Sequence, residues 1–425
     1  MAGDEPESSG RSPRTQSMLA VLNAIARHSA ITQHDLAAET KLSRATVSTV
    51  LARLRKEELI ERPADIAEPS SEGRSSLARL MNDAAPAICV DLGERHVASG
   101  AGGPRGLLGE SRVHDFERTA APLELLNQAT RQVQEIMGEQ LTRYRPDELV
   151  GVCVSMAAPL DQLRGQVTPR SGMDMWIGLR PARELQARLG RRWDTVPFMI
   201  ENNANLDALA AIANRPKQHE VNVCQDAVLL VRWGGGIGGG AVLDNRVIVG
   251  ARGIATEIGH TPLHRNAEDG ELGPCTRCGH YCLDSRASGR ALTAQFAREQ
   301  DEEISFDLLI RRAVERDGRE RELLRKAAKE IGEVVGGYVS FLNPGLVVIS
   351  GYHFEEASTS ANAYTLIADP LRSGMRATAF PPTLEDVEVA LGAQSRSSTV
   401  EGGVIAVLQK HMTAYFERLL TARGS

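Results

Sequence analysis

Several features that would place this sequence in other classes of protein are missing from it. No apolar run reaches the roughly 18 residues that a membrane-spanning helix requires. The first residues, 1–13, are polar and lack the apolar stretch of a secretory signal. Aromatic residues make up only 4% of the chain, and the charged fraction of 24% is typical of globular proteins rather than fibrous or disordered ones. We therefore expect a cytoplasmic protein that does not contact membranes.

The sequence also has few cysteines, and its net charge is negative. Six cysteines in so long a chain do not build a disulfide framework, and the clustering of three of them indicates a metal site instead. The net charge of −6 argues against a general affinity for nucleic acid, but the charge is unevenly distributed. From Arg11 to Arg62 there are nine Lys or Arg residues against five Asp or Glu, so a basic segment precedes an acidic body.

The 425 residues are too many for one ordinary core, so the length indicates two or three domains. From Ala87 onward, short β runs alternate with helical stretches, which is typical of an α/β architecture. The expected parts are a disordered arm at 1–13, a small domain at 14–83, a first α/β lobe at 84–201, a second α/β lobe at 202–399, and a C-terminal helix at 400–425 that packs back on the first lobe. The expected strands are Ala87–Leu92, Leu149–Ser155, Phe198–Glu201, Ala227–Arg232 and Leu346–Ser350, and the long helices are Leu123–Gly138, Ala182–Gly190 and Arg319–Leu342.

The pattern of the small domain predicts three helices followed by a β hairpin. Apolar residues recur at helical spacing in its first part. Thr32 and Ser43 are suited to cap the second and third helices, and Lys41 lies in the turn between them. Two short β segments on either side of a polar loop, which holds Arg74, form a wing. Three helices with a tight turn before the third, and a wing after it, describe a winged helix-turn-helix.

The third helix begins with small polar residues, which permit close approach to the base edges and phosphates of double-stranded DNA. Arg44 is the strongest candidate for a base or phosphate contact, and Arg74 at the tip of the wing for a contact in the minor groove. The alternative is a three-helix protein-interaction module with a solvated charged face. The residues expected to contact a DNA operator are Gln33, Ser43, Arg44, Ala45, Thr46, Ser48, Arg53 and Arg74.

Three motifs taken together resemble one known family. They are the helix-turn-helix segment from Asp35 to Ser48, the run Thr256-Glu-Ile-Gly-His260, and a cysteine cluster followed by Leu283-Asp284. On these motifs the sequence is similar to the ROK family of bacterial repressors and sugar kinases, from roughly Thr15 to the C-terminus. The resemblance implies a body with an actin-like, ribonuclease-H-like ATPase fold of two α/β lobes. It also implies a homodimer or homotetramer.

The resemblance identifies the position where a sugar kinase carries its catalytic base. Such an enzyme needs a carboxylate that takes the proton of the attacking hydroxyl group. In the family this residue is an Asp directly after an Asn, and the matching residue here, after Asn202, is Asn203. An amide cannot accept that proton, and the loss of a general base costs about two to four orders of magnitude in rate.

The loops that bind phosphate in the kinases of the family differ here as well. Glu94 and Arg95 replace a glycine and a threonine in the first loop, and Gly235 stands where the kinases usually carry a phosphate-binding threonine. Tyr352 and His353 occupy a third loop that is expected to be rich in glycine, where their bulk obstructs close approach of the backbone. We therefore expect that the chain is not an enzyme. The alternative is a sugar kinase that retains ATP-dependent activity.

The sugar-binding positions implied by the resemblance are better preserved. Fixed polar groups recognise sugar hydroxyls because a ligand that lacks one leaves a buried group unpaired. The expected effector is a sugar or a sugar-derived molecule; the alternatives are a retained but empty pocket, and a regulator that responds to a non-sugar ligand or a protein partner. By resemblance, the effector-binding residues are Asn202, Asn203, Glu257, His260 and Asp284, the last in place of the family's usual Glu.

A metal site is expected beside this pocket. One histidine and three cysteines make up the donor set of a closed, structural Cys₃His zinc site. The family spaces these cysteines at relative positions 0, 2 and 7, whereas here they fall at 0, 3 and 7. His280 is an alternative ligand, and free buried thiols are the alternative to a metal. The expected ligands are His260, Cys275, Cys278 and Cys282, and the expected core cysteines are Cys89, Cys153 and Cys224.

Taken together, these features predict a DNA-binding transcriptional regulator, a repressor of carbohydrate-metabolism genes, whose kinase-like body binds a sugar-type effector without phosphorylating it. Effector binding is expected to rotate the lobes and to change the spacing of paired DNA-reading heads. A dimer would then no longer match two half-sites about one helical turn apart.

Overall fold

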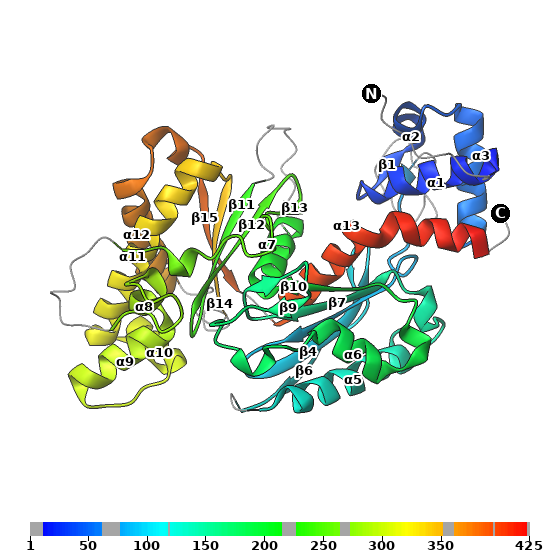
Figure 1. Ribbon diagram of the computed structural model, residues 1–425. Coiled ribbons are helices and arrows are strands. Elements are labelled where there is room, and N and C mark those ends of the chain that lie inside the picture. Colours follow the sequence, from blue (N-terminus) through cyan, green and yellow to red (C-terminus); the bar gives the residue numbers. More distant parts are fainter. Residues whose placement is uncertain are drawn as a thin grey trace, which may run out of the picture.

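A computed structural model of the chain describes residues 12–61, 77–117, 120–214, 227–263, 273–351, 361–393 and 396–422. In this part of the chain, a small helical head is followed by a body of two α/β lobes (Figure 1). The predicted α/β class, with a winged helix-turn-helix in front of a two-lobed body, is thereby confirmed. Among the described residues, every helix is too short or too polar to span a lipid bilayer.

The described part of the head contains three helices, two of which begin at the capping residues that the sequence predicts. The Thr32 hydroxyl accepts a hydrogen bond from the backbone N–H of Asp35 at 3.1 Å, and the Ser43 hydroxyl accepts one from Thr46 at 3.1 Å. Lys41 adopts a left-handed conformation, with φ of 57°, in the turn between the second and third helices. The three helices are α1 (Pro13–Ala26), α2 (Gln33–Thr40) and α3 (Arg44–Lys56).

The first helix begins earlier than predicted. Ser12 is its N-cap and Pro13 is its first residue, and both lie inside the segment that was expected to be a disordered arm. Proline is favoured in the first turn of a helix because the N–H that it lacks would have no partner there. The rest of the expected arm, residues 1–11, lies outside the described part of the chain.

Short extended segments form the base of the wing. Strand β1 pairs with β2 in the antiparallel direction, and Ile60 forms an antiparallel bridge with Leu80. The apolar faces of the three helices meet in one core with these segments. The loop predicted for the tip of the wing, with Arg74, lies outside the described residues. The strands are β1 (Ile31–Thr32) and β2 (Leu77–Ala78), and the buried core residues include Met18, Leu22, Ile25, Val47, Leu51 and Leu54.

The first lobe is a sheet with helices on both faces. Its strands follow the order β10-β7-β3-β4-β5, and β6 also pairs with β4; β3, β7 and β10 are parallel, and β4 is antiparallel to β3. Because side chains alternate along a strand, Ile88 and Val90 pack with α5 and α6, whereas Ala87 and Cys89 pack with α13. The elements are β3 (Ala87–Leu92), β4 (His96–Gly103), β5 (Gly106–Leu107), β6 (Arg112–Asp115), α5 (Pro122–Glu139), β7 (Gly151–Met156), α6 (Pro181–Leu189), β10 (Phe198–Asn202) and α13 (Arg396–Ala422).

The second lobe repeats this plan. Its strand order is β13-β12-β11-β14-β15, again with a parallel part and an antiparallel second strand. Leu229 and Val231 pack with α11 and α12 on one face, and Val228 and Leu230 pack with α7 on the other. The elements are α7 (Asn203–Ala213), β11 (Val228–Trp233), β12 (Ile237–Leu243), β13 (Arg246–Val247), α8 (Leu283–Ala287), α9 (Gly289–Gln300), α10 (Phe306–Glu315), α11 (Arg319–Leu342), β14 (Leu346–Gly351), α12 (Ala361–Thr378) and β15 (Glu388–Ala393). A small hairpin and five short 3₁₀ helices complete the described body: β8 (Leu160–Asp161), β9 (Gln166–Val167), η2 (Pro146–Glu148), η3 (Asp174–Trp176), η4 (Arg191–Trp193), η5 (Ile258–His260) and η9 (Pro381–Leu384).

The C-terminal helix α13 crosses α7 and strand β3 at a pair of glycines. A Cβ atom at Gly402 would collide with the backbone of Leu206, and one at Gly403 would collide with the side chain of Cys89. A hydrogen bond of 2.5 Å from Thr399 to Asp207 ties the same end of α13 to α7. The absence of side chains at the two glycines is therefore what lets α13 lie so close to both lobes.

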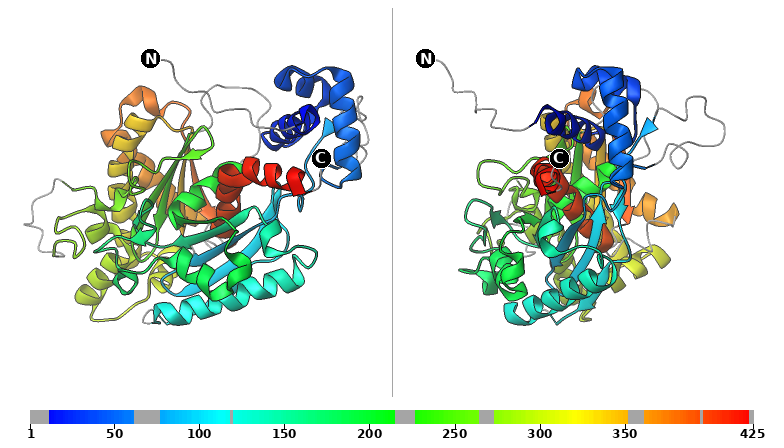
Figure 2. Two further views of the ribbon diagram at one scale, coloured as in Figure 1. Left: turned by 45° about the vertical axis from the view of Figure 1, so that its right-hand side comes forward. Right: turned by 90° about the vertical axis from the view of Figure 1, so that its right-hand side faces the viewer.

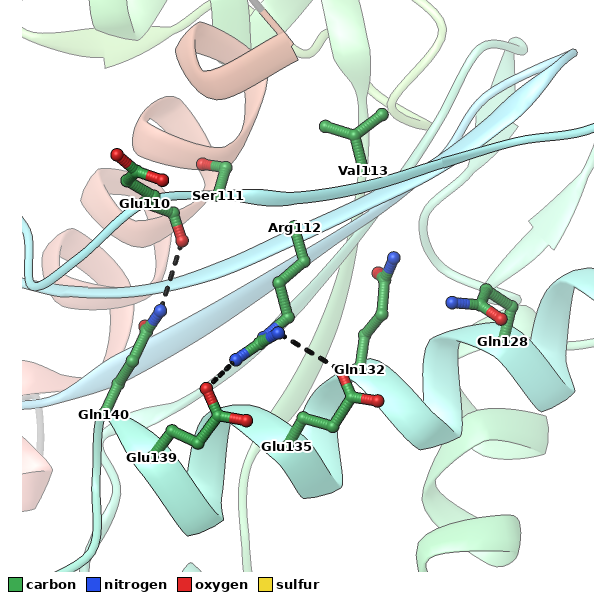
Figure 3. A pocket seen from close by; sticks show the side chains of 9 residues that line it. All are labelled: Glu110, Ser111, Arg112, Val113, Gln128, Gln132, Glu135, Glu139 and Gln140. Atoms are coloured by element: carbon green, nitrogen blue, oxygen red, sulfur yellow. Dashed lines mark hydrogen bonds and ion pairs between the residues drawn. The ribbon is translucent and has the colours of Figure 1, made fainter.

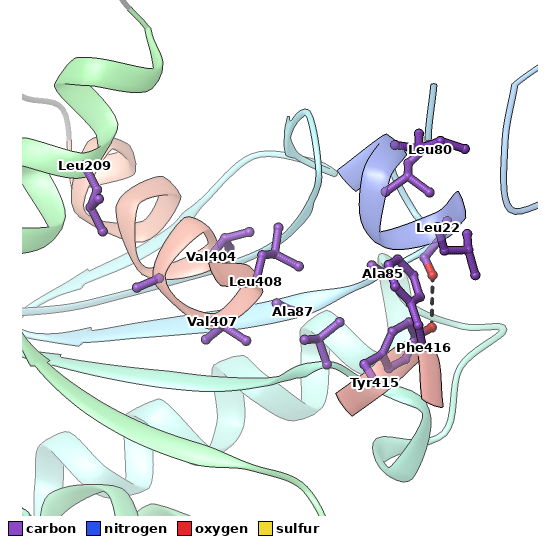
Figure 4. Close-up of a cluster of buried hydrophobic side chains, with 14 of the residues drawn as sticks. Leu22, Leu80, Ala85, Ala87, Leu209, Val404, Val407, Leu408, Tyr415 and Phe416 are labelled. Atoms are coloured by element: carbon purple, nitrogen blue, oxygen red, sulfur yellow. Dashed lines mark hydrogen bonds between the residues drawn. The ribbon is translucent and has the colours of Figure 1, made fainter. Parts of the chain in front are cut away.

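The other end of α13 lies against the head. Figure 2 shows from two further directions that this end of the helix lies beside α1. Leu22 of α1 belongs to the same buried cluster as Tyr415 and Phe416 of α13 (Figure 4). The Tyr415 hydroxyl also donates to the carbonyl of Ala84, at the junction of head and body, at 3.0 Å. One helix thus contacts both lobes and the head.

Candidate functional site

The predicted effector residues come from three places in the chain that meet around strand β12. Asn203 is the first residue of α7, Glu257 precedes η5, and Asp284 lies in α8. Strand β12 carries glycines where these segments approach it: a Cβ atom at Gly239 would meet the carbonyl of Thr256, and one at Gly240 would meet that of Ala204. The glycines of β12 therefore permit α7 and the segment around Thr256 to pack closely on its two faces.

The predicted effector residues divide into two groups by their hydrogen bonds. Both polar atoms of the Asn202 amide have a partner, since its Oδ1 accepts from Ala204 N at 2.8 Å and its Nδ2 donates to Ala158 O at 2.9 Å. One carboxylate oxygen of Asp284 accepts from Ile237 N at 2.7 Å. Asn202 and Asp284 thus fix the local backbone beside the other predicted effector residues.

The second group has open hydrogen-bonding capacity. Within the described residues, the side-chain amide of Asn203, the carboxyl group of Glu257 and the Nε2 atom of His260 have no hydrogen-bond partner. Asn203 is 4% exposed as a residue, whereas Glu257 and His260 are half-buried. These side chains therefore have hydrogen-bonding capacity that a small polar ligand could use.

Burial also changes the acid–base properties of this group. It raises the pKa of Glu257 to about 7, a shift that Arg277 opposes and Asp284 reinforces. Burial also lowers the pKa of His260, so that its imidazole favours the neutral form. A carboxyl group with a pKa near neutrality can both donate and accept hydrogen bonds, whereas His260 offers only its Nε2 atom, because Nδ1 lies against the thiols.

The predicted metal ligands lie together. One ligand atom from each of His260, Cys275, Cys278 and Cys282 falls within 4.8 Å of every other. The Nδ1 atom of His260 is 3.8 Å from Cys275 Sγ and 3.7 Å from Cys282 Sγ. Ligand atoms bound to a tetrahedral zinc ion at about 2.0–2.3 Å lie about 3.6–3.8 Å apart, so these separations fit such an ion.

The shifted cysteine spacing is compatible with this cluster. The side chain of His280, the alternative ligand, is not part of it. His280 is exposed, and only its carbonyl takes part, accepting from Cys275 N at 2.9 Å. Because the cluster uses the Nδ1 atom of His260, the Nε2 atom of the same ring is left for the pocket. Of the cysteines expected in the core, Cys89 and Cys153 are buried in strands β3 and β7, and Cys224 lies outside the described residues.

Two arginines beside the predicted effector residues were not predicted from the sequence. Arg277 lies inside the cysteine loop, and Arg290 lies in the first turn of α9, where its backbone N–H donates to the carbonyl of Gly235 at 3.2 Å. Their guanidinium groups approach Glu94 of the first lobe at 3.9 and 3.8 Å. The position of Arg277 between two predicted ligands was the one sequence signal that could have identified it.

The first of the loops that resemble phosphate-binding loops is filled by its own side chains. Asp91 is fully buried, with His96 Nε2 at 2.8 Å from one carboxylate oxygen and the Ser155 hydroxyl at 2.6 Å from the other. Burial raises the pKa of Asp91, but His96, Arg232 and Ser155 together outweigh it, and the pKa is lowered overall. The imidazole lies directly against Gly93, in the space that a Cβ atom there would need. Tyr352 and His353 of the third loop lie outside the described residues.

The predicted DNA-reading residues lie on one helix and its N-terminal neighbour. Ser43, Arg44, Ala45 and Ser48 are exposed, and Thr46 is half-buried beneath the Ser43 cap. The Gln33 side chain donates to the Arg44 carbonyl at 3.1 Å, and the Arg44 guanidinium lies 2.8 Å from His34 Nδ1. Arg53, in contrast, is paired with Glu57 at 2.7 Å and is only 23% exposed, so it is less available for a DNA contact than the exposed Arg44.

A separate cavity of about 480 Å³ lies between β6 and α5, away from the predicted site residues (Figure 3). Three of its four charged side chains pair with one another: Arg112 contacts Glu139 and lies 3.2 Å from Glu135. The lining residues are Glu110, Ser111, Arg112, Val113, Gln128, Gln132, Glu135, Glu139 and Gln140.

The fold and these sites define a two-lobed protein with a sugar-kinase-like body and a winged helix-turn-helix head. The family model described as the ROK family matches residues 87–396, and the one described as the MarR family matches residues 15–67. The chain belongs to the ROK family and carries a MarR-type winged helix at its N-terminal end.

Similar proteins include both regulators and kinases. The chain is 24% identical to the xylose repressor of Lactiplantibacillus pentosus over 343 residues, which are 79% of this chain and 81% of that protein. It is 29% identical to the N-acetyl-D-glucosamine kinase of Pasteurella multocida over 199 residues, 44% of this chain, and covers 62% of that kinase's length. The crystal structure of a ROK family transcriptional regulator, a homolog of the E. coli MLC protein, superposes with a TM-score of 0.71 at 18% identity, over 96% of this chain and 98% of that one. Identity this low supports a common fold alone.

Proposed function

We propose that this chain is a DNA-binding transcriptional regulator, a repressor of carbohydrate-metabolism genes, whose ROK body binds a sugar-type effector without phosphorylating it. The observation that carries the proposal is that one helix, α13, contacts both lobes and the head. The similarity to a xylose repressor over most of both chains supports the same assignment.

Two features of the pocket argue against phosphoryl transfer. Asn203 presents an amide where the kinases of the family have a carboxylate, and an amide cannot act as a general base. Asp91 is already engaged by His96 and Ser155, so its carboxylate is not free to organise a phosphate or its metal ion. Binding of a sugar requires neither function.

A structural metal ion would support the pocket. His260, Cys275, Cys278 and Cys282 would hold zinc, and the ion would supply a rigid centre for the loop without taking part in chemistry. With Nδ1 as the ligand atom, Nε2 of His260 remains able to bind a hydroxyl group.

The contacts of α7 and α13 provide a route from effector to DNA. Asn203 begins α7, and α7 packs on α13 where Gly402 meets Leu206. Because α13 then continues to α1, a rotation of one lobe against the other would move the head. In a homodimer or homotetramer, that movement changes the distance between two recognition helices, which bind half-sites about 34 Å apart.

The test is fluorescence anisotropy of the purified protein on double-stranded DNA from upstream of its own gene, titrated with free sugars and their phosphates. We expect tight binding and release by one sugar-type ligand. If the protein binds the DNA and no ligand changes its affinity, the proposal of DNA binding stands and the proposal of a sugar effector is refuted. In parallel, the protein is incubated with ATP and the same sugars, and clear turnover would favour the kinase alternative.

A further inference from the structure

Three charged side chains face one another across the boundary between the lobes, beside the proposed pocket. Glu94 follows strand β3 of the first lobe, whereas Arg277 and Arg290 belong to the second. One carboxylate oxygen of Glu94 lies 3.9 Å from Arg277 and 3.8 Å from Arg290, so it bridges the two guanidinium groups. The side chains are 21 to 38% exposed, which leaves them accessible to a small ligand.

These contacts leave most of the binding capacity of the two arginines unused. Distances of 3.8 and 3.9 Å exceed those of hydrogen bonds, so they represent loose ion pairs. Each guanidinium has five N–H donors, and within the described residues none of them has a hydrogen-bond partner. Most other arginines in the body make closer contacts; Arg319, for example, reaches Glu299 at 2.5 Å.

The two arginines border the residues proposed to bind a sugar. Arg290 lies 3.7 Å from Asp284, and its guanidinium also lies next to Gly236, beside the Ile237 N–H that Asp284 accepts from. Arg277 is near enough to both Glu257 and His260 to influence their ionisation. Its guanidinium also lies against Gly172 of the first lobe, so this side chain spans the boundary.

We infer that the effector is a monosaccharide with one anionic group, a phosphate or a carboxylate, which Arg277 and Arg290 bind in place of Glu94. This inference rests on the proposed function, because it assumes that the pocket takes a sugar. Planar guanidinium groups bind phosphate and carboxylate oxygens in pairs of short, charge-assisted hydrogen bonds, which the loose pairs with Glu94 do not provide. Displacement of Glu94 also removes a contact between the lobes, so the same event would release one lobe from the other.

The test compares acidic and neutral sugars that share a ring. Binding to the full-length protein is measured by calorimetry for D-glucose, D-glucose 6-phosphate and D-glucuronate, for N-acetyl-D-glucosamine and its 6-phosphate, and for inorganic phosphate alone. We expect an acidic member of one set to bind at least about tenfold more tightly than its neutral partner. The phosphate and carboxylate forms distinguish the two sources of negative charge.

Substitutions test whether the two arginines cause the preference for acidic over neutral sugars. Arg277→Gln and Arg290→Gln should each abolish it, and Glu94→Gln should strengthen the binding of the acidic sugar by removing its competitor. Arg311→Gln, an exposed position on α10, is the matched control. Because Arg277 lies in the cysteine loop, metal content is measured for every variant, and Arg290→Gln tests the inference independently of that loop.

The outcomes separate this inference from the proposed function. Equal binding of neutral and acidic sugars, or a preference that survives both arginine substitutions, would overturn the anionic effector and leave the sugar-responsive regulator intact. If no sugar and no phosphate binds while the operator DNA does, both the anionic effector and the sugar effector are refuted, and only the DNA-binding part of the proposed function stands.

Discussion

Thr413 donates a hydrogen bond of 3.0 Å to Asn23, although the two residues are 390 positions apart in the chain. The bond joins the C-terminal helix to the first helix of the head, next to the apolar contact of Leu22 with the cluster of Tyr415 and Phe416. The head is therefore held by contacts with α13 as well as by its covalent connection to the body. Its orientation depends on a helix whose other end lies between the lobes.

Gly402→Ala tests this connection. The added Cβ atom would collide with the backbone of Leu206, which cannot move without shifting α7. We expect a loss of about 1–3 kcal/mol in the free energy of unfolding, measured by urea denaturation, together with a weaker response of DNA binding to the effector. Gly337→Ala is the control, because this glycine lies in the interior of α11 with open space around it, and alanine there should be neutral or slightly stabilising. Equal behaviour of the two variants would contradict the close packing of α13 on α7.

The parts of the structure that the sequence predicts are those set by local chemistry. Thr32, Lys41 and Ser43 determine helix ends within a few residues, and the strand at Ala87–Leu92 follows from an apolar run that only Asp91 interrupts. The four residues of the candidate metal cluster were also named in advance, because clustered cysteines indicate a metal site and the family resemblance added His260.

The parts that the sequence does not predict depend on contacts between distant segments. Nothing around Gly402 indicates that Leu206 lies against it, and the pairing of Arg277 with Glu94 joins residues of different lobes. The role of His96 was missed for a similar reason. A histidine five residues after Asp91 has no preferred partner until the β3–β4 turn brings the two together.

Metal analysis should distinguish the predicted ligands from the nearby histidine. We expect about one zinc ion per chain, with His260→Ala or Cys282→Ser losing most of it, because a closed site needs all four ligands. His280→Ala should retain the metal, since this side chain is exposed and lies outside the cluster. The measurement is elemental analysis of the purified variants after dialysis. Retention of zinc by the His260 variant would show that the cluster is not the metal site.

Asn203→Asp restores a carboxylate at the position of the kinase base. If only the base were missing, this change would raise phosphoryl transfer by about two to four orders of magnitude. We expect no such gain, because Asp91 remains held by His96 and Ser155 and the first loop is filled. The phosphoryl-transfer activity of the original protein and of the Asn203→Asp variant is measured with radiolabelled ATP and a panel of sugars. Efficient turnover by the substituted protein would mean that the first loop can still serve catalysis.

Glu257 should make the stability of the protein depend on pH. Burial raises its pKa from an ordinary 4.5 to about 7, so the folded state binds a proton that the unfolded chain has already released between these values. The stabilising contribution of this group is therefore complete below pH 4.5 and is lost as the pH rises to 7. Glu257→Gln, which cannot titrate, should flatten the decline in the free energy of unfolding over this interval. Urea denaturation at pH 5, 6 and 7.5 measures the free energy of unfolding of both proteins. If it declines equally in the variant, groups other than Glu257 cause the pH dependence.

Two arginines on the same helix provide a matched test of the DNA-reading face. Arg44 is exposed at the start of α3, whereas Arg53 is paired with Glu57 and turned away from solvent. If Arg44 contacts a base or a phosphate, Arg44→Ala should weaken operator binding by about 1–3 kcal/mol. A phosphate contact would in addition reduce the slope of log K against log salt by about 1, while a base contact would relax specificity at one position.

Arg53→Ala should leave operator affinity nearly unchanged, because its charge is already neutralised within the helix. A large loss from Arg53→Ala together with none from Arg44→Ala would mean that the C-terminal half of α3, rather than its start, faces the DNA.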